Sequence, residues 1–151
     1  MKIIIIILSV LMATQSWAME SDDIASAEQE LKAYFFAAAR MNDVVVLNEF
    51  VDAGFPINVT NEQGYTALMV ATYHGNIEAF DYLVSQKAST CAVDNKGNTA
   101  LMAAIFRGEF SLAKKLISYE CDSKHKNMAG NDAVNFAEVF GRDDMLKLLN
   151  K

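Results

Sequence analysis

The sequence predicts an all-α fold, a solenoid of about four helix-turn-helix units joined by short hairpin loops. Two observations predict it. The segment GYTALMVATYHGN at residues 64–76 returns as GNTALMAAIFRGE at residues 97–109, 33 positions later. Each copy is followed by a second stretch in which apolar residues recur at helical spacing. A unit repeated at this period builds a stack in which neighbouring units bury one continuous core.

The first 18 residues are typical of a secretory signal peptide. Lys2 gives a positive start, residues 3–13 are almost wholly apolar, and residues 16–18 form a small-x-small cleavage site. A retained membrane anchor is the alternative, but the apolar run is well short of the roughly 20 residues that a spanning helix needs. We therefore expect cleavage after Ala18 and no membrane insertion of the mature chain. The short leader favours export to a bacterial periplasm, with eukaryotic secretion as the alternative.

The rest of the chain divides into an acidic leader at residues 19–27 and a repeat domain at residues 28–151. The predicted repeats occupy residues 28–60, 61–93, 94–126 and 127–151. The first unit is less regular than the next two, and its start is predicted to be a capping box at Ser26 to Gln29.

Each later unit opens with a predicted tight turn. Its first residue is Asn or Asp and its fourth is Gly, the signature of a type I turn, at residues 61–64, 94–97 and 127–130. Two residues after these glycines come Thr66, Thr99 and Asp132. A side-chain oxygen at this place accepts a hydrogen bond from an unpaired amide at the start of a helix. We expect these three residues to be the N-caps of the first helices.

The first helix of each unit is predicted to end at a residue in the left-handed conformation. Gly75, Gly108 and Gly141 occupy this place, and Asn42, the common substitute for Gly, occupies it in the first unit. Phe35 stands where the second and third units have Leu. Small residues on these helices let neighbouring helices approach closely, at Ala38, Ala71, Ala104 and Ala137.

A second helix follows in each unit, with one apolar face. The predicted faces are Val44, Leu47, Phe50 and Val51, then Ile77, Phe80, Leu83 and Val84, then Phe110, Ala113, Leu116 and Ile117. In the last unit Asp143 and Asn150 replace apolar residues and leave Leu146 and Leu149. A polar outer side is what the terminal repeat of a stack requires.

A turn, a helix, a tight turn and a second helix every 33 residues resemble the ankyrin repeat. The family's Thr-Pro-Leu-His motif is represented by residues 66–69 and 99–102, where Ala replaces Pro and Met replaces His. Residues 54–58 are similar to the family's hairpin approach, whereas residues 120–124 are degenerate. Taken together, the chain resembles small exported bacterial ankyrin-repeat proteins.

The resemblance implies binding to another protein through the hairpin tips and the exposed side of the first helices. The positions there that vary between units are the predicted partner contacts: Arg40, Met41, Glu62, Gln63, Tyr65, Tyr73, His74, Asn95, Lys96, Asn98, Phe106, Arg107, Val139 and Phe140. Aromatic and Arg side chains dominate interface hot spots, so Tyr73, Phe106 and Arg107 are the expected centre. The alternative for Tyr73, Phe106 and Phe140 is partial burial against the next repeat.

Other classes of function find little support in the sequence. A net charge of −6 repels phosphate backbones, so nucleic acid is not an expected partner. Neither a Gly-rich phosphate loop nor a nucleophile elbow is present to predict an enzyme or a cofactor. His74 and His125 have no further ligand at metal spacing, so no metal site is predicted. Cys91 and Cys121 either form one disulfide in an oxidising compartment or are two half-buried thiols.

Two roles are compatible with an exported binding module. In the first, a chain that is monomeric when free blocks or escorts one partner protein. Such a chain would be an immunity or inhibitor protein against an envelope-damaging enzyme such as a phospholipase. In the second, it resembles periplasmic ankyrin proteins associated with catalase and peroxide defence, with His74, His125 or Met residues as contacts to haem. Fold analogy alone does not choose between them.

Overall fold

The computed structural model describes residues 23–119 and 121–150. The chain divides into two units between Tyr34 and Phe35. The predicted signal peptide and its cleavage site lie outside the described residues. Residues 23–34 are helical, and the helix continues to residue 41. The capping box predicted at Ser26 is therefore wrong: Ser26 lies inside a helix, because the Ala and Glu residues around it favour helix strongly enough to continue through it.

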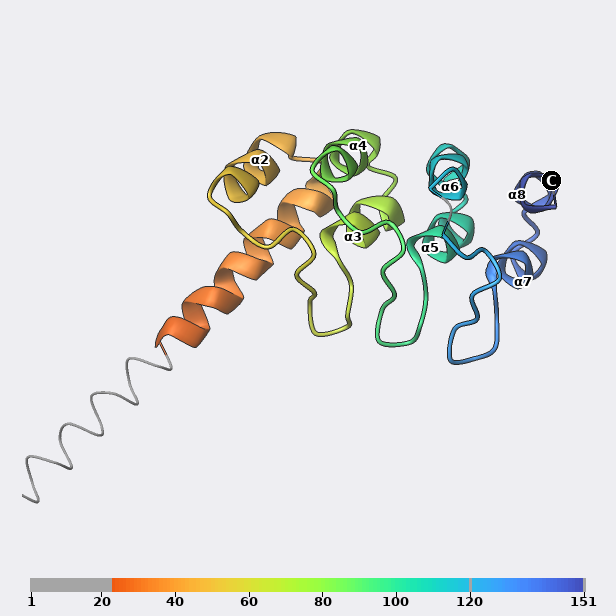
Figure 1. Cartoon of the computed structure of the whole chain (residues 1–151), viewed down its shortest axis with the longest axis horizontal. Coiled ribbons are helices and arrows are strands. Elements are labelled where there is room, and N and C mark those ends of the chain that lie inside the picture. The colour runs from red at the N-terminus through yellow and green to blue at the C-terminus, as the bar shows by residue number, and fades with distance from the viewer. Residues whose placement is uncertain (1–22, 120, 151) are drawn as a thin grey trace, which may run out of the picture. The chain divides into compact units, whose positions relative to one another are not determined.

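The second unit is built from pairs of helices. After the helix that ends at residue 41 come α2 (Val44–Asp52), α3 (Ala67–Tyr73), α4 (Ile77–Ser85), α5 (Ala100–Arg107), α6 (Phe110–Ile117), α7 (Ala133–Val139) and α8 (Asp143–Leu149). The inner helices α3, α5 and α7 lie in one row, the outer helices α2, α4, α6 and α8 in another, and the hairpin loops extend to one side (Figure 1). The predicted all-α stack of helix-turn-helix units is confirmed.

Each inner helix begins at its predicted cap. The side-chain oxygens of Thr66, Thr99 and Asp132 accept hydrogen bonds from the backbone N–H three residues later, at 3.3, 3.2 and 2.9 Å. Asn135 returns the contact in the last repeat, where its Oδ1 accepts from the N–H of Asp132 at 3.2 Å. The predicted left-handed residues are also confirmed, with φ of +59° at Asn42, +71° at Gly75, +79° at Gly108 and +61° at Gly141.

The hairpin tips form the predicted turns and are bonded to one another. Asn61 Oδ1 accepts from the N–H groups of Gln63 and Tyr65 at 3.0 and 2.9 Å, and Asp94 and Asn127 act in the same way. Asn95 reaches back to the preceding tip, where its N–H donates to the Gln63 carbonyl at 3.0 Å. Gly64 permits this approach, because a side chain there would collide with Asn95 and φ is +79°.

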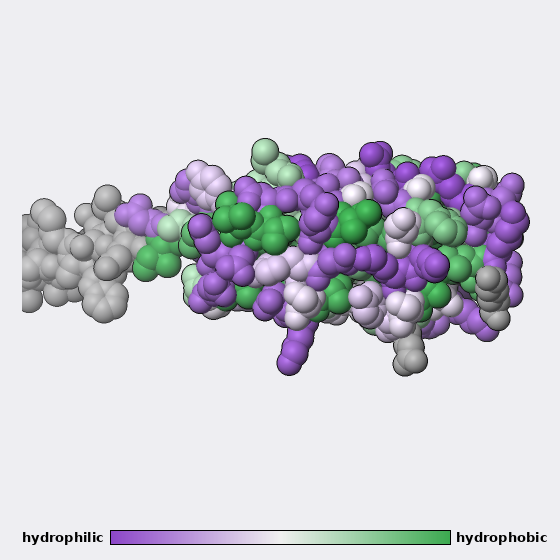
Figure 2. All heavy atoms as spheres, turned by 90° about the horizontal axis from the view of Figure 1, so that it is seen from above, coloured by the Kyte–Doolittle hydropathy of each residue, from purple (hydrophilic) through white to green (hydrophobic). Residues whose placement is uncertain are grey.

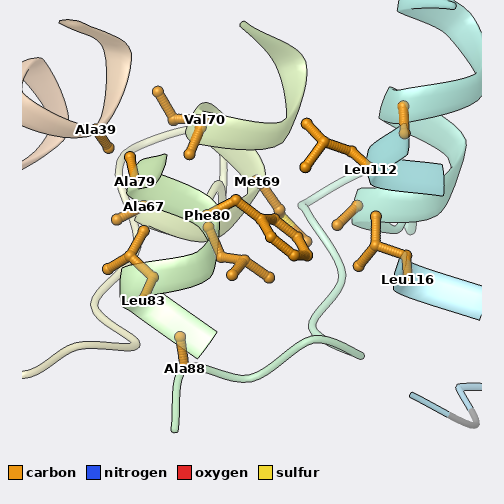
Figure 3. Close-up of a cluster of buried hydrophobic side chains, with 14 of the residues drawn as sticks. Ala39, Ala67, Met69, Val70, Ala79, Phe80, Leu83, Ala88, Leu112 and Leu116 are labelled. Atoms are coloured by element: carbon orange, nitrogen blue, oxygen red, sulfur yellow. The ribbon is translucent and has the colours of Figure 1, made fainter. Parts of the chain in front are cut away.

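The core lies between the two rows of helices. Phe80 and Leu83 of α4 pack with Met69 of α3 and meet side chains of α6 (Figure 3). The inner-helix alanines Ala71, Ala104 and Ala137 are fully buried, as close helix packing requires. On the N-terminal side, Phe35 of the first predicted unit is fully buried in the same cluster.

The apolar faces predicted for the outer helices need one correction. Ile77 and Phe110 are 39% and 43% exposed, whereas Ala79 and Leu112, two residues further along their helices, are buried. In α8 the residue at the same place, Met145, is buried as well. At 3.6 residues per turn, Ile77 lies roughly 110° from the centre of the face formed by Ala79, Phe80 and Leu83. The outer-helix surface consequently mixes hydrophobic with hydrophilic side chains (Figure 2).

Cys91 and Cys121 are joined by a disulfide in the structure, with their Cα atoms 5.4 Å apart. Thr90 Oγ1 lies 3.7 Å from Cys91 Sγ and 3.6 Å from Cys121 Sγ. The bond encloses α5 and α6, so it closes a loop around one whole repeat.

Candidate binding groove

Three aromatic rings at the ends of the inner helices form a row across successive repeats. Tyr73 and Phe106 stack with their ring centroids 6.2 Å apart, and Phe106 meets Phe140 edge-on at 4.8 Å. Each ring is nevertheless 39–40% exposed. The rings therefore contact the next repeat, as the alternative interpretation had it, and still present a substantial surface to a partner.

The backbone beneath this row is held by polar side chains of the following repeat. Arg107 Nε donates to the Tyr73 carbonyl at 3.1 Å, and Arg142 Nη2 donates to the Phe106 carbonyl at 3.0 Å. The last carbonyls of a helix have no partner within it, and a cation at this end also complements the helix dipole. The positions of the rings are thus fixed by the repeat stack.

Positive charge gathers beside Tyr73. The guanidinium carbon of Arg107 lies 4.9 Å from the centroid of the Tyr73 ring, a cation–π contact, and the His74 ring lies 5.3 Å from it. Partial burial lowers the pKa of His74, and the nearby charges of Arg40 and Arg107 lower it further. Burial and the two positive charges therefore favour the neutral form of the imidazole.

The three rings, together with Arg40 and His74, line a groove of about 660 Å³. It includes nine of the predicted contact residues: Arg40, Gln63, Tyr65, Tyr73, His74, Lys96, Asn98, Phe106 and Phe140. Eight further residues complete it: Asn61, Met69, Val70, Asp94, Thr99, Met102, Ala103 and Phe136. The groove extends from the end of the helix at residues 23–41 to α7, along one side of the inner helices.

Five predicted contacts lie outside the groove lining. Met41 and Val139 are 78% and 74% exposed, and Glu62 is exposed at a hairpin tip. Arg107 lies at the edge through its contact with Tyr73. Asn95 bonds the neighbouring hairpin instead, because its Nδ2 donates to the Glu62 carbonyl at 2.8 Å.

Sequence reasoning missed most of the added residues because they already had a structural role. Thr99 is a helix cap and Asp94 a turn residue, and nothing in the repeat pattern indicates that they also face a groove. Phe136 had a usable signal: it lies one helical turn before Phe140, and the two rings are 5.8 Å apart.

The described residues contain no group of three or more His, Cys, Asp or Glu side chains that could hold a metal ion. In the same part of the chain, every helix is too short or too polar to cross a membrane.

Residues 34–127 match a family model described as ankyrin repeats (3 copies). The match covers more than half of the chain and coincides with the helix pairs and hairpins described above. A search of curated proteins found no match. Repeats of this kind indicate a protein–protein interaction module, which is typically non-catalytic.

Proposed function

The chain belongs to the ankyrin-repeat family, and from that premise we propose that it is an exported, non-enzymatic protein that binds one partner protein in its groove. Blocking or escorting that partner in the periplasm is the role we propose for it. An immunity or inhibitor protein against an envelope-damaging enzyme, such as a phospholipase, is the form of this role that we favour.

One observation carries the proposal: the row of Tyr73, Phe106 and Phe140 is both ordered and exposed. Rings that already pack on one another lose little conformational freedom on binding, so more of their contact energy remains as affinity. Tyr and Arg, which are adjacent here, are also among the residue types enriched in interface hot spots.

A capture experiment with matched variants tests the proposal. The tagged mature chain is incubated with periplasmic extract of its host, and bound proteins are identified by mass spectrometry. We expect one dominant partner, lost with the Tyr73→Ala/Phe106→Ala variant. Phe110→Ala is the control, because Phe110 is 43% exposed but lies on an outer helix away from the groove.

The result separates the possible roles. Loss of capture with Phe110→Ala but not with the double variant would move the interface to the outer helices and overturn the proposal. A captured hydrolase whose activity falls on binding would support the inhibitor role. A captured catalase would instead favour the role in peroxide defence.

A further inference from the structure

The groove differs in charge from the molecule as a whole. The chain has a net charge of −6, yet the charged side chains lining the groove are Arg40, Lys96 and Asp94, with Arg107 at the edge. The Asp94 carboxylate is already engaged: it accepts from the N–H groups of Lys96 and Asn98 at 2.8 Å and from Asn98 Nδ2 at 2.9 Å. Salt bridges among the described residues involve none of the three cations.

We propose that the segment of the partner that enters this groove is acidic and carries an aromatic or large aliphatic side chain. The inference rests on the proposed function and adds the chemistry of the partner. Within the described residues neither guanidinium group forms a salt bridge, so each can donate paired hydrogen bonds to a carboxylate. The exposed rings provide an apolar surface for the second side chain.

The cations and the Phe rings of the groove lie at different places along the stack. Their order predicts where the acidic and the apolar side chains of the partner segment lie. The Arg107 side chain lies at the end of α3, where its guanidinium carbon is 4.9 Å from the Tyr73 ring centroid and its Nε donates to the Tyr73 carbonyl. Arg40, at the end of the preceding helix, lines the same side of the groove. Phe106, Phe136 and Phe140 gather next to α7, with ring centroids 4.8 Å and 5.8 Å apart. Carboxylates of the segment therefore lie near α3, and its apolar side chain lies near α7.

Labelled peptides test the proposed acidic character of the partner segment directly, without the natural partner. The probe is a fluorescein-labelled peptide that contains Glu, Phe and Gly, and its matched counterparts carry Lys for each Glu or Ala for each Phe. Binding to the mature protein is measured by fluorescence anisotropy at low and high salt. We expect the Glu/Phe peptide to bind at least about tenfold more tightly than either counterpart, and less tightly at high salt.

Charge-reversal variants locate the site. Arg40→Glu combined with Arg107→Glu should weaken the Glu/Phe peptide at least about tenfold. Lys114→Glu, an exposed position on the outer helix α6, makes a control for the effect of net charge. Lys96→Glu is a second charge reversal in the groove. In the described structure Lys96 makes hydrogen bonds through backbone atoms only, so weaker peptide binding by this variant reports charge and not loosening of α3.

Equal binding of the Glu and Lys peptides, binding of neither, or equal weakening by Lys114→Glu would overturn the inference. The proposed function is judged separately by the capture experiment. A captured partner that is lost with Tyr73→Ala/Phe106→Ala, but is not displaced by the Glu/Phe peptide, leaves that function standing and refutes the acidic segment alone.

Discussion

The environment of His74 shows how the repeat stack sets the chemistry of one side chain. Burial is the largest cause of its lowered pKa. The positive charges of Arg40, from the preceding repeat, and Arg107, from the following repeat, lower the pKa further. The unfolded chain has an ordinary His pKa of about 6.5, so around and below that value it binds the proton more readily than the folded chain. The contribution of His74 to stability is thus present above pH ~6.5 and is lost as the pH falls.

Removal of one charge should reverse part of this shift. We predict that Arg107→Gln raises the pKa of His74, since a neutral neighbour no longer opposes the imidazolium, and that it reduces the loss of stability on acidification. The pKa is measured by NMR titration of the His74 ring protons, with Lys114→Gln as the control. An unchanged pKa in Arg107→Gln would contradict the assigned cause.

Leu101 tests the core at the same scale. It is 7% exposed and belongs to the buried cluster, so Leu101→Ala should lower the free energy of unfolding by about 2–5 kcal/mol. Urea denaturation followed by circular dichroism measures the change. Val139→Ala, at a position that is 74% exposed, is the matched control and should alter stability by less than about 0.5 kcal/mol. Equal stability of the two variants would refute the packing described for α5.

At the scale of elements, the hairpins and outer-helix ends are joined by bonds between repeats. Asn95 connects two tips, the Met128 N–H donates to the Lys96 carbonyl at 2.9 Å, and the Cys91–Cys121 disulfide connects the segments that follow α4 and α6. Each of these bonds joins neighbouring repeats only. Loss of one bond is therefore expected to loosen the two repeats that it joins and to leave the others unchanged.

Loss of the disulfide should destabilise the third repeat more than the others. The sequence separation is 30, for which loop closure in the unfolded chain predicts a loss of about 3–4 kcal/mol. We expect Cys91→Ser/Cys121→Ser to show this loss in urea denaturation, with faster amide hydrogen exchange in α5 and α6. A reductant should destabilise the parent protein and leave the double variant unaffected. A reductant that destabilises both equally would contradict the role assigned to the disulfide.

The sequence predicted best what local interactions decide. Caps at Thr66 and Thr99 and the left-handed Asn42 depend on hydrogen bonds and sterics within a few residues, and all are confirmed. The faces of the outer helices depend on the angle at which the next pair packs, and there Ile77 was assigned to the core although it is 39% exposed. The groove depends on several repeats at once, so its aromatic row could be predicted whereas the contributions of Met69 and Met102 could not.

At the scale of the whole molecule, an acidic chain carries cations along one groove that form no salt bridge with the other residues of the described structure. Net negative charge repels other acidic surfaces, whereas a local positive groove attracts a segment of opposite charge. The separation of the two signs therefore favours one site of contact over non-specific association. This is why the charge of the partner segment, rather than its shape alone, is the property we expect the groove to select.

Export and the disulfide should occur together in the mature protein. Disulfides persist in oxidising compartments, so a chain that leaves the cytoplasm by its predicted signal peptide can keep the Cys91–Cys121 bond. Intact mass spectrometry of protein from the periplasm of its host should give a chain that begins at Met19 and lacks both thiol hydrogens. Ala18→Arg should leave the leader attached, because signal cleavage requires a small residue there. A full-length chain in the membrane, or two thiols that react with an alkylating agent in the native protein, would refute this prediction.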